Sequence, residues 1–144
     1  MQKENEVRAR LTARGFEEND EGIVADSPTM VRSSFRNIVS VTAMKGWFLQ
    51  TIDIKSAFLQ GQELERPVYV KPPKEAETNK IWRLKKCLYG LKDASRKWYD
   101  IVKKTLTDLG CVMSKTDPAV FIFKENNEVS GILGTHVDDF HCAK

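Results

Sequence analysis

Apolar residues recur at helical spacing in two stretches of the chain. The first stretch follows Asp26-Ser27-Pro28-Thr29, a sequence typical of a helix start, and it ends before Gly46. Its periodic positions are Val31, Phe35, Ile38, Val39 and Thr42. The second stretch covers residues 94–109 and ends before Gly110, with periodic positions at Trp98, Ile101, Val102, Leu106 and Leu109. We expect an amphipathic helix in each stretch.

Shorter stretches carry the alternating or β-branched pattern of strands. They cover residues 7–14, 47–54, 68–70, 81–87, 119–123 and 129–133, and the last two flank a turn-prone segment at residues 124–128. The elements therefore follow the order strand, helix, strand, two short strands, helix and hairpin. This order predicts an α+β fold, in which an antiparallel sheet has its helices packed on one face.

The composition is that of one folded domain. The chain has 144 residues, of which 41% are hydrophobic and 30% charged, and it contains no repeat and no linker rich in Pro, Gly or Ser. We expect residues 1–144 to form a single module. No apolar run is long enough for a membrane-spanning helix or a secretory signal, which favours an intracellular protein without a membrane partner. Cys87, Cys111 and Cys142 form no Cys-x-x-Cys pair, so we expect three reduced thiols.

Positive charge is concentrated between Lys80 and Lys104, although the whole chain carries only +3. In this basic stretch, nine cations stand against the two acids Asp93 and Asp100. The cations are Lys80, Arg83, Lys85, Lys86, Lys92, Arg96, Lys97, Lys103 and Lys104, and four aromatic residues are interleaved with them, Trp82, Tyr89, Trp98 and Tyr99. The pattern fits two interpretations equally, a solvated helix face or a surface that contacts a sugar-phosphate backbone and stacked bases.

Three carboxylates stand in or beside apolar strand patterns. Asp138 and Asp139 interrupt an apolar run at residues 131–142, and Asp53 ends the strand pattern at residues 47–54. An Asp pair is often only a turn, but the flanking Val137 and Phe140 favour strands. Carboxylates from two neighbouring strands could together hold Mg²⁺ or Mn²⁺, and two such ions about 3.5–4 Å apart serve phosphoryl transfer.

Other polar residues near these positions have an ordinary interpretation beside a chemical one. His136 and His141 flank the Asp pair, and a half-buried strand histidine is the simpler explanation for each, because neither has a partner histidine at a metal-binding spacing. Arg8, Arg10 and Arg14 either solubilise an edge strand or hold phosphate groups.

Several motifs occur in an order that resembles the copia-type LTR retrotransposon reverse transcriptases. They are Ala9-Arg10-Leu11-Thr12-Ala13-Arg14-Gly15-Phe16, Asp26-Ser27-Pro28, Ile52-Asp53-Ile54-Lys55-Ser56-Ala57-Phe58-Leu59-Gln60-Gly61, Leu84-Lys85-Lys86-Cys87-Leu88-Tyr89-Gly90-Leu91-Lys92, Lys97-Trp98-Tyr99, Asp117-Pro118 and Val137-Asp138-Asp139. The resemblance covers nearly the whole chain. It implies a palm-type antiparallel sheet with partial fingers and no thumb.

The resemblance also implies an activity and its site. Asp53, Asp138 and Asp139 correspond to the catalytic carboxylates, which in this family hold two Mg²⁺ ions, with Mn²⁺ as a substitute. A DNA primer would be extended with deoxynucleoside triphosphates (dNTPs) on an RNA or DNA template. The implied nucleotide-binding residues are Arg8, Arg10, Phe58, Tyr89, Gly90 and Lys92, where Phe58 resembles the aromatic gate against a ribose 2′-hydroxyl and is equally a core aromatic. For nucleic-acid binding the corresponding residues are Lys85, Lys86, Arg96 and Lys97.

The chain departs from the family pattern at two places. His136 replaces the usual Tyr before Val-Asp-Asp, and Asp93-Ala94-Ser95 replaces Gln-Ala-Pro. Asp93 is expected to be mildly unfavourable beside a phosphate-bearing substrate, although no metal ligand is lost. Family members continue into the rest of the palm, a thumb, an RNase H domain and an integrase, which are expected partners. They act in cytoplasmic particles or the nucleus.

A second hypothesis is an inactive remnant of a retroelement that folds and binds nucleic acid through the basic stretch. A weaker third hypothesis is a protein-binding fragment without a nucleic-acid role.

Overall fold

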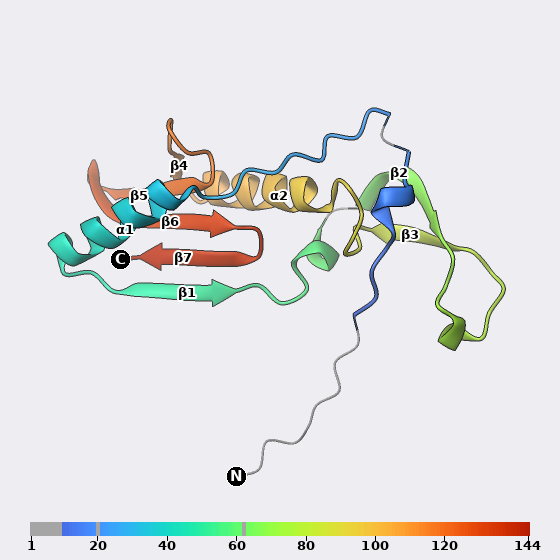
Figure 1. The fold of residues 1–144 in the computed structure, drawn as a ribbon. Coiled ribbons are helices and arrows are strands. Elements are labelled where there is room, and N and C mark those ends of the chain that lie inside the picture. The colour runs from blue at the N-terminus through green and yellow to red at the C-terminus, as the bar shows by residue number, and fades with distance from the viewer. Residues whose placement is uncertain (1–9, 20, 62) are drawn as a thin grey trace, which may run out of the picture.

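The computed structural model describes residues 10–19, 21–61 and 63–144 (Figure 1). An antiparallel sheet of five strands has the order β1-β7-β6-β5-β4, and β2 and β3 form a separate two-stranded antiparallel sheet. The strands are β1 Leu49–Asp53, β2 Glu63–Val70, β3 Trp82–Lys86, β4 Val112–Met113, β5 Val120–Glu125, β6 Glu128–His136 and β7 Asp139–Ala143. The helices are α1 Arg32–Lys45 and α2 Ala94–Asp108, with 3-10 turns η1 Gly15–Glu17, η2 Ala57–Gln60 and η3 Lys74–Ala76. The predicted α+β class and antiparallel sheet are confirmed.

The two helices lie against opposite faces of the larger sheet. Ile38 of α1 packs with Val120 and Ala143, whereas Trp98 of α2 packs with Phe140. Phe140 and Ala143 both belong to β7 and are three residues apart, so their side chains point to opposite faces of the sheet. The arrangement differs from the expected packing of both helices on one face. The cause is the burial pattern of β6, whose consecutive residues 131–135 are all buried or half-buried, as in a strand that is covered on both faces.

Helix α1 begins later than its sequence signal. The Ser27 hydroxyl donates to the Ser95 carbonyl at 3.0 Å and does not cap a helix. The start of the helix is instead stabilised by a residue distant in sequence, because the Val31 amide donates to the Asp117 carboxylate at 3.0 Å. Gly46 ends the helix in the left-handed conformation, as predicted.

Most other predicted elements are present. The β5–β6 hairpin turns at Asn126 and Asn127, which both have positive φ and fit a type I′ turn. The strand predicted at residues 7–14 is wrong for residues 10–14, which form no strand, and residues 7–9 lie outside the described part. Residues 10–14 lie beside the loop that contains Tyr89, and the Ala13 amide donates a hydrogen bond to the Tyr89 carbonyl. They form no strand ladder. Strand β4 has no counterpart in the prediction, because its two residues are too short for a pattern.

All three cysteines are free thiols, as expected. Cys87 and Cys111 are buried, whereas Cys142 is half-buried. Burial raises the pKa of the Cys87 thiol, and the nearby Asp93 adds to that rise. Burial also raises the pKa of Cys111. Among the described residues, no helix has the length and apolar character needed to cross a membrane.

The thiols are therefore expected to react at different rates. At neutral pH in the folded protein, Cys142 should be labelled by a water-soluble disulfide reagent well before Cys87 and Cys111, because thiolate is the reactive form and both buried thiols have raised pKa values. Mass spectrometry of peptides after timed labelling measures each site. In denaturant the three rates should converge, and equal rates in the folded protein would contradict this packing.

Candidate active site

Asp53 and Asp139 face each other across the β1–β7 ladder. Phe48 and Lys144 exchange both backbone hydrogen bonds at the start of this ladder, and the Ile54 amide donates to the Asp138 carbonyl at its end. Hydrogen-bonded and non-hydrogen-bonded residue pairs alternate along an antiparallel ladder. Counted from these two bonded positions, Asp53 and Asp139 form a non-hydrogen-bonded pair, the kind whose side chains approach most closely. Both carboxylates therefore point to the same face of the sheet, at the end where β1 stops and β6 turns into β7 (Figure 1).

The opposed carboxylates have no counter-charge in the described part of the chain. Asp53 and Asp139 are exposed, and neither forms an ion pair or a side-chain hydrogen bond with a described residue. Like charges directly opposite each other destabilise a strand pair, and positive charge between the two carboxylates would lessen that repulsion. Within the described residues, no three His, Cys, Asp or Glu side chains are gathered closely enough to hold a metal ion. The register thus brings together two of the three predicted carboxylates.

Asp138 lies in the tight turn between β6 and β7. Val137 precedes it with φ of 57°, a strained conformation for a β-branched residue. The Trp98 indole on α2 donates to the Val137 carbonyl at 2.8 Å and holds the turn from the other face of the sheet. The turn interpretation of the Asp pair is therefore correct for Asp138, while Asp139 already belongs to β7.

The two histidines have different surroundings. His141 contacts the Phe35 ring, with 5.0 Å between centroids, and its Nδ1 lies 3.2 Å from the Thr51 hydroxyl, so it has the ordinary structural role expected of a strand histidine. His136 is exposed and is the cross-strand partner of Asp139. Asp53, Asp139 and His136 consequently form a row across β1, β7 and β6, which sequence spacing alone did not predict.

Three of the predicted nucleotide-binding side chains meet beside η2. The Phe58 and Tyr89 rings form an edge contact with 4.8 Å between centroids, and the Arg10 guanidinium lies over the Tyr89 ring at 4.8 Å. These residues come from three separate segments of the chain. Arg8, the alternative candidate for the Arg10 position, lies outside the described residues.

Gly90 allows two backbones to approach closely. It has φ of 88°, and a Cβ atom placed there would lie 2.1 Å from the Ala13 carbonyl oxygen. Reciprocally, a Cβ at Gly15 would lie 2.0 Å from the Gly90 carbonyl oxygen. The Tyr89-Gly90 loop therefore contacts residues 13–15 through main chain alone, which positions Arg10 near Tyr89.

Lys92 and its neighbour Asp93 are held by partners that sequence analysis missed. The Lys92 ammonium donates to the Glu18 carbonyl at 3.0 Å. Asp93 is only 5% exposed and accepts two hydrogen bonds from Arg66, at 2.9 and 3.2 Å. The bond to Asp93 is the main reason why the pKa of Arg66 is raised above its ordinary value. No periodic or motif signal marks Arg66 in the sequence.

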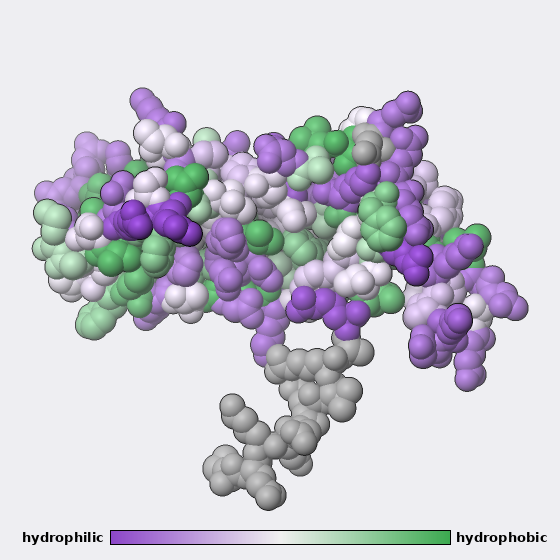
Figure 2. All heavy atoms as spheres, in the orientation of Figure 1, coloured by the Kyte–Doolittle hydropathy of each residue, from purple (hydrophilic) through white to green (hydrophobic). Residues whose placement is uncertain are grey.

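The predicted nucleic-acid-binding cations lie on two elements. Lys85 and Lys86 are exposed on β3, at the right-hand end of the molecule in Figure 1, where Figure 2 shows many hydrophilic residues, as it does elsewhere on this face. Arg96 and Lys97 lie in the first turn of α2, where Arg96 pairs with Asp100 at 3.2 Å and Lys97 is half-buried. Arg96 is therefore engaged within the chain, whereas Lys85 and Lys86 have no ion-pair partner in the part of the chain that the structure describes.

Comparison with known proteins gives the class of the chain. Residues 1–143 match the family model described as reverse transcriptase (RNA-dependent DNA polymerase), so the chain belongs to that family. It is 32% identical over 141 residues to the retrovirus-related Pol polyprotein from transposon RE1 of Arabidopsis thaliana, with 94% of this chain and 10% of that protein covered. It is 36% identical over 141 residues to the corresponding polyprotein from transposon TNT 1-94 of Nicotiana tabacum, with 92% and 10% covered.

These relatives confirm the predicted copia-type affiliation. The chain spans about a tenth of the length of the curated relatives it matches. No solved structure matches it.

The close approach at Gly90 leads to a first test of the site. Gly90→Ala should lower the free energy of unfolding more than Gly110→Ala, which has a similar φ of 85° but no atom within 4 Å of the added methyl group. The backbone cost alone is about 1–2 kcal/mol, and only Gly90→Ala also forces two main chains apart. Urea unfolding of both variants measures the difference. Equal losses would show that the close approach contributes nothing.

The indole bond to the Val137 carbonyl leads to a second test. Trp98→Phe should cost about 1–2 kcal/mol of unfolding free energy through the lost hydrogen bond, and it should speed hydrogen exchange at the Ile54 amide, which bonds to Asp138. Trp82→Phe is the matched control, because the Trp82 indole has no hydrogen-bond partner among the described residues. Unchanged exchange at Ile54 in the Trp98 variant would contradict a role in holding the turn.

Proposed function

We propose that this chain provides the nucleotidyl-transfer site of an RNA-directed DNA polymerase. It would extend a DNA primer with dNTPs on an RNA or DNA template, releasing pyrophosphate. The observation that carries the proposal is the cross-strand pair of Asp53 and Asp139, two exposed carboxylates that face each other with no counter-charge from residues 10–19, 21–61 and 63–144. The family membership of the chain supports the same reaction.

Asp53, Asp138 and Asp139 are the proposed holders of two Mg²⁺ ions, with Mn²⁺ as a substitute. Their donor atoms are carboxylate oxygens, which suit these hard cations, and the opposed charges of Asp53 and Asp139 favour a cation between β1 and β7. When bound, such ions activate the attacking oxygen and stabilise the leaving oxygen in phosphoryl transfer. The role of the protein is to hold the carboxylates in place through the strand register and the turn at Val137.

The incoming nucleotide would lie against Phe58, Tyr89 and Gly90. The two rings offer apolar surface to a sugar and a base, and the backbone of Gly90 is exposed beside Tyr89. Phe58 would crowd a ribose 2′-hydroxyl. Arg10 would bind the triphosphate after leaving the Tyr89 ring, and Lys92 would add positive charge on the same side.

The template and primer would contact the cations of the basic stretch. Lys85 and Lys86 are the best placed, because both are exposed on β3. Lys97 and Arg96 would contribute from the start of α2. The rest of the palm, a thumb, an RNase H domain and an integrase of a longer polyprotein are the proposed partners.

Primer extension tests the proposal directly. With Mg²⁺ or Mn²⁺ and all four dNTPs, Asp138→Asn should lower the extension rate by about 100-fold or more, because it removes a charge that stabilises the reacting centre. Asp108→Asn is the matched control, since Asp108 is exposed at the end of α2, away from the β6–β7 turn. Equal rates for wild type and the Asp138 variant would refute the assignment.

The same preparation tests the inactive, nucleic-acid-binding alternative. The observation in its favour is that no three-carboxylate group is assembled among the described residues. This alternative predicts no extension product but binding to single strands or RNA–DNA hybrids that weakens steeply with salt. Binding that is independent of salt would exclude it.

A further inference from the structure

Arg66 joins three segments of the chain that are distant in sequence. Its guanidinium forms two hydrogen bonds to Asp93 at the start of α2, and its Nη1 lies 2.5 Å from the Glu18 carboxylate as an ion pair. Glu18 also accepts a hydrogen bond from the Lys92 amide at 3.3 Å, and its carbonyl accepts one from the Lys92 ammonium at 3.0 Å. Glu18, Arg66, Lys92 and Asp93 are here named the Arg66 cluster.

The Arg66 cluster is balanced in charge and partly buried. It contains two carboxylates and two cations, and the exposed fractions of the side chains of Arg66, Glu18 and Asp93 are 31%, 14% and 8%. Removal of one partner from such a group leaves an uncompensated charge in a poorly solvated position. A single guanidinium that bridges two carboxylates is therefore much harder to replace than an exposed ion pair.

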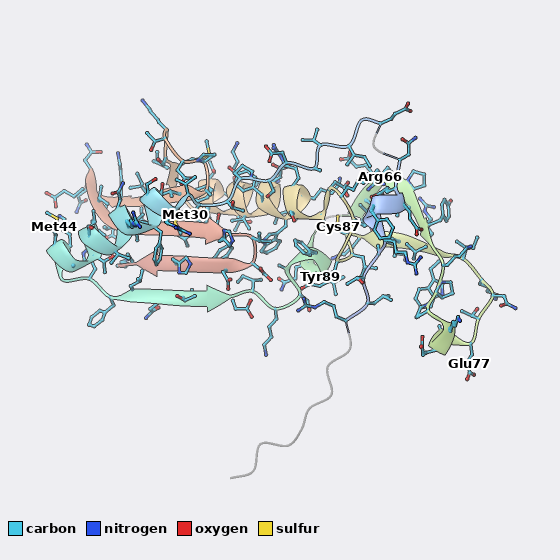
Figure 3. The ribbon with its side chains drawn as sticks, in the orientation of Figure 1. Met30, Met44, Arg66, Glu77, Cys87 and Tyr89 are labelled. Carbon is cyan, nitrogen blue, oxygen red and sulfur yellow. The ribbon has the colours of Figure 1, made fainter. Side chains whose placement is uncertain are left out.

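The position of the Arg66 cluster connects it to the proposed nucleotide site. It lies between the segment at residues 13–18 and the loop at residues 89–93, the two segments whose backbones touch at Gly15 and Gly90. Figure 3 shows Arg66 on β2 and Tyr89 at the same end of the molecule. Arg10 leads into the first segment and contacts Tyr89 in the second, so separation of the segments would displace both Arg10 and Lys92.

We propose that Arg66 is a positioning residue, which holds residues 13–18 against the loop at residues 89–93 and thereby places Lys92 and Arg10 for the incoming nucleotide. The proposal rests on the proposed function. Arg66 itself binds the carboxylates of Glu18 and Asp93 and has no role in the chemical step. A lysine at this position would keep the charge but could not form the same forked contacts with both carboxylates.

Limited trypsin cleavage tests the holding role without any need for polymerase activity. Cleavage after Arg14 yields a fragment that begins at Gly15, a buried residue that becomes accessible when the segments separate. Arg66→Met should speed this cleavage by about tenfold, the factor expected from loss of one charge-assisted contact, and Arg66→Lys should lie between it and wild type. Arg36→Met, on the exposed side of α1, is the control and should cleave as wild type does. An unchanged rate in Arg66→Met would overturn the proposal.

A double variant distinguishes the loss of the Arg66–Asp93 contact from a general loss of stability. Arg66→Met combined with Asp93→Asn should cleave more slowly than Arg66→Met alone, because the second change removes the carboxylate that the first leaves unpaired. Additive effects of the two changes would contradict a direct coupling between Arg66 and Asp93.

Steady-state primer extension tests the link to the nucleotide. Arg66→Met should raise the KM for dNTP by about tenfold with kcat within about twofold of wild type, and Arg66→Lys should recover part of the loss. A fall in kcat with an unchanged KM would overturn the positioning role. If the wild-type chain extends no primer, the proposed function fails, whereas the trypsin rates still decide whether Arg66 holds the segments together.

Discussion

The pairing of β1 with β7 determines which side chains meet at the candidate site. A slip of one residue in this ladder would turn the side chain of Asp53 to the opposite face of the sheet from Asp139. The register is marked by the reciprocal bonds of Phe48 with Lys144, by the bond of the Ile54 amide to the Asp138 carbonyl and by the contact of Thr51 with His141. This register places two carboxylates directly opposite each other, an arrangement that is unfavourable for the strand pair itself.

Phe58 connects these carboxylates to the other half of the site. It follows β1 by five residues, and its ring packs both against Trp98 and Ala57 behind the larger sheet and against the buried cluster that contains Leu91. Its edge contact with Tyr89 is therefore fixed by two apolar cores at once. An aromatic side chain can therefore serve as a core residue and still border the proposed nucleotide site, so the two interpretations of Phe58 are compatible.

The sequence predicted those parts of the molecule that depend on local pattern. Both helices, the β5–β6 hairpin and the strand that ends at Asp53 follow from periodicity and turn residues. The start of α1 was misplaced because its stabilising carboxylate belongs to Asp117, far away in the sequence. The opposite faces of α1 and α2, and the row that includes His136, depend on strand order, which no local pattern encodes.

Asp93 illustrates why a departure from a family pattern must be judged with its surroundings. Considered alone, a carboxylate where the family usually has Gln adds negative charge near the segment that we propose binds the nucleotide. In the structure, that charge is buried and bound by Arg66, which also neutralises Glu18. Asp93 therefore presents little negative charge to a ligand, and its effect on the site acts through the position of Arg66. The main consequence of the substitution is therefore structural: Asp93 binds Arg66 and links β2 to the start of α2.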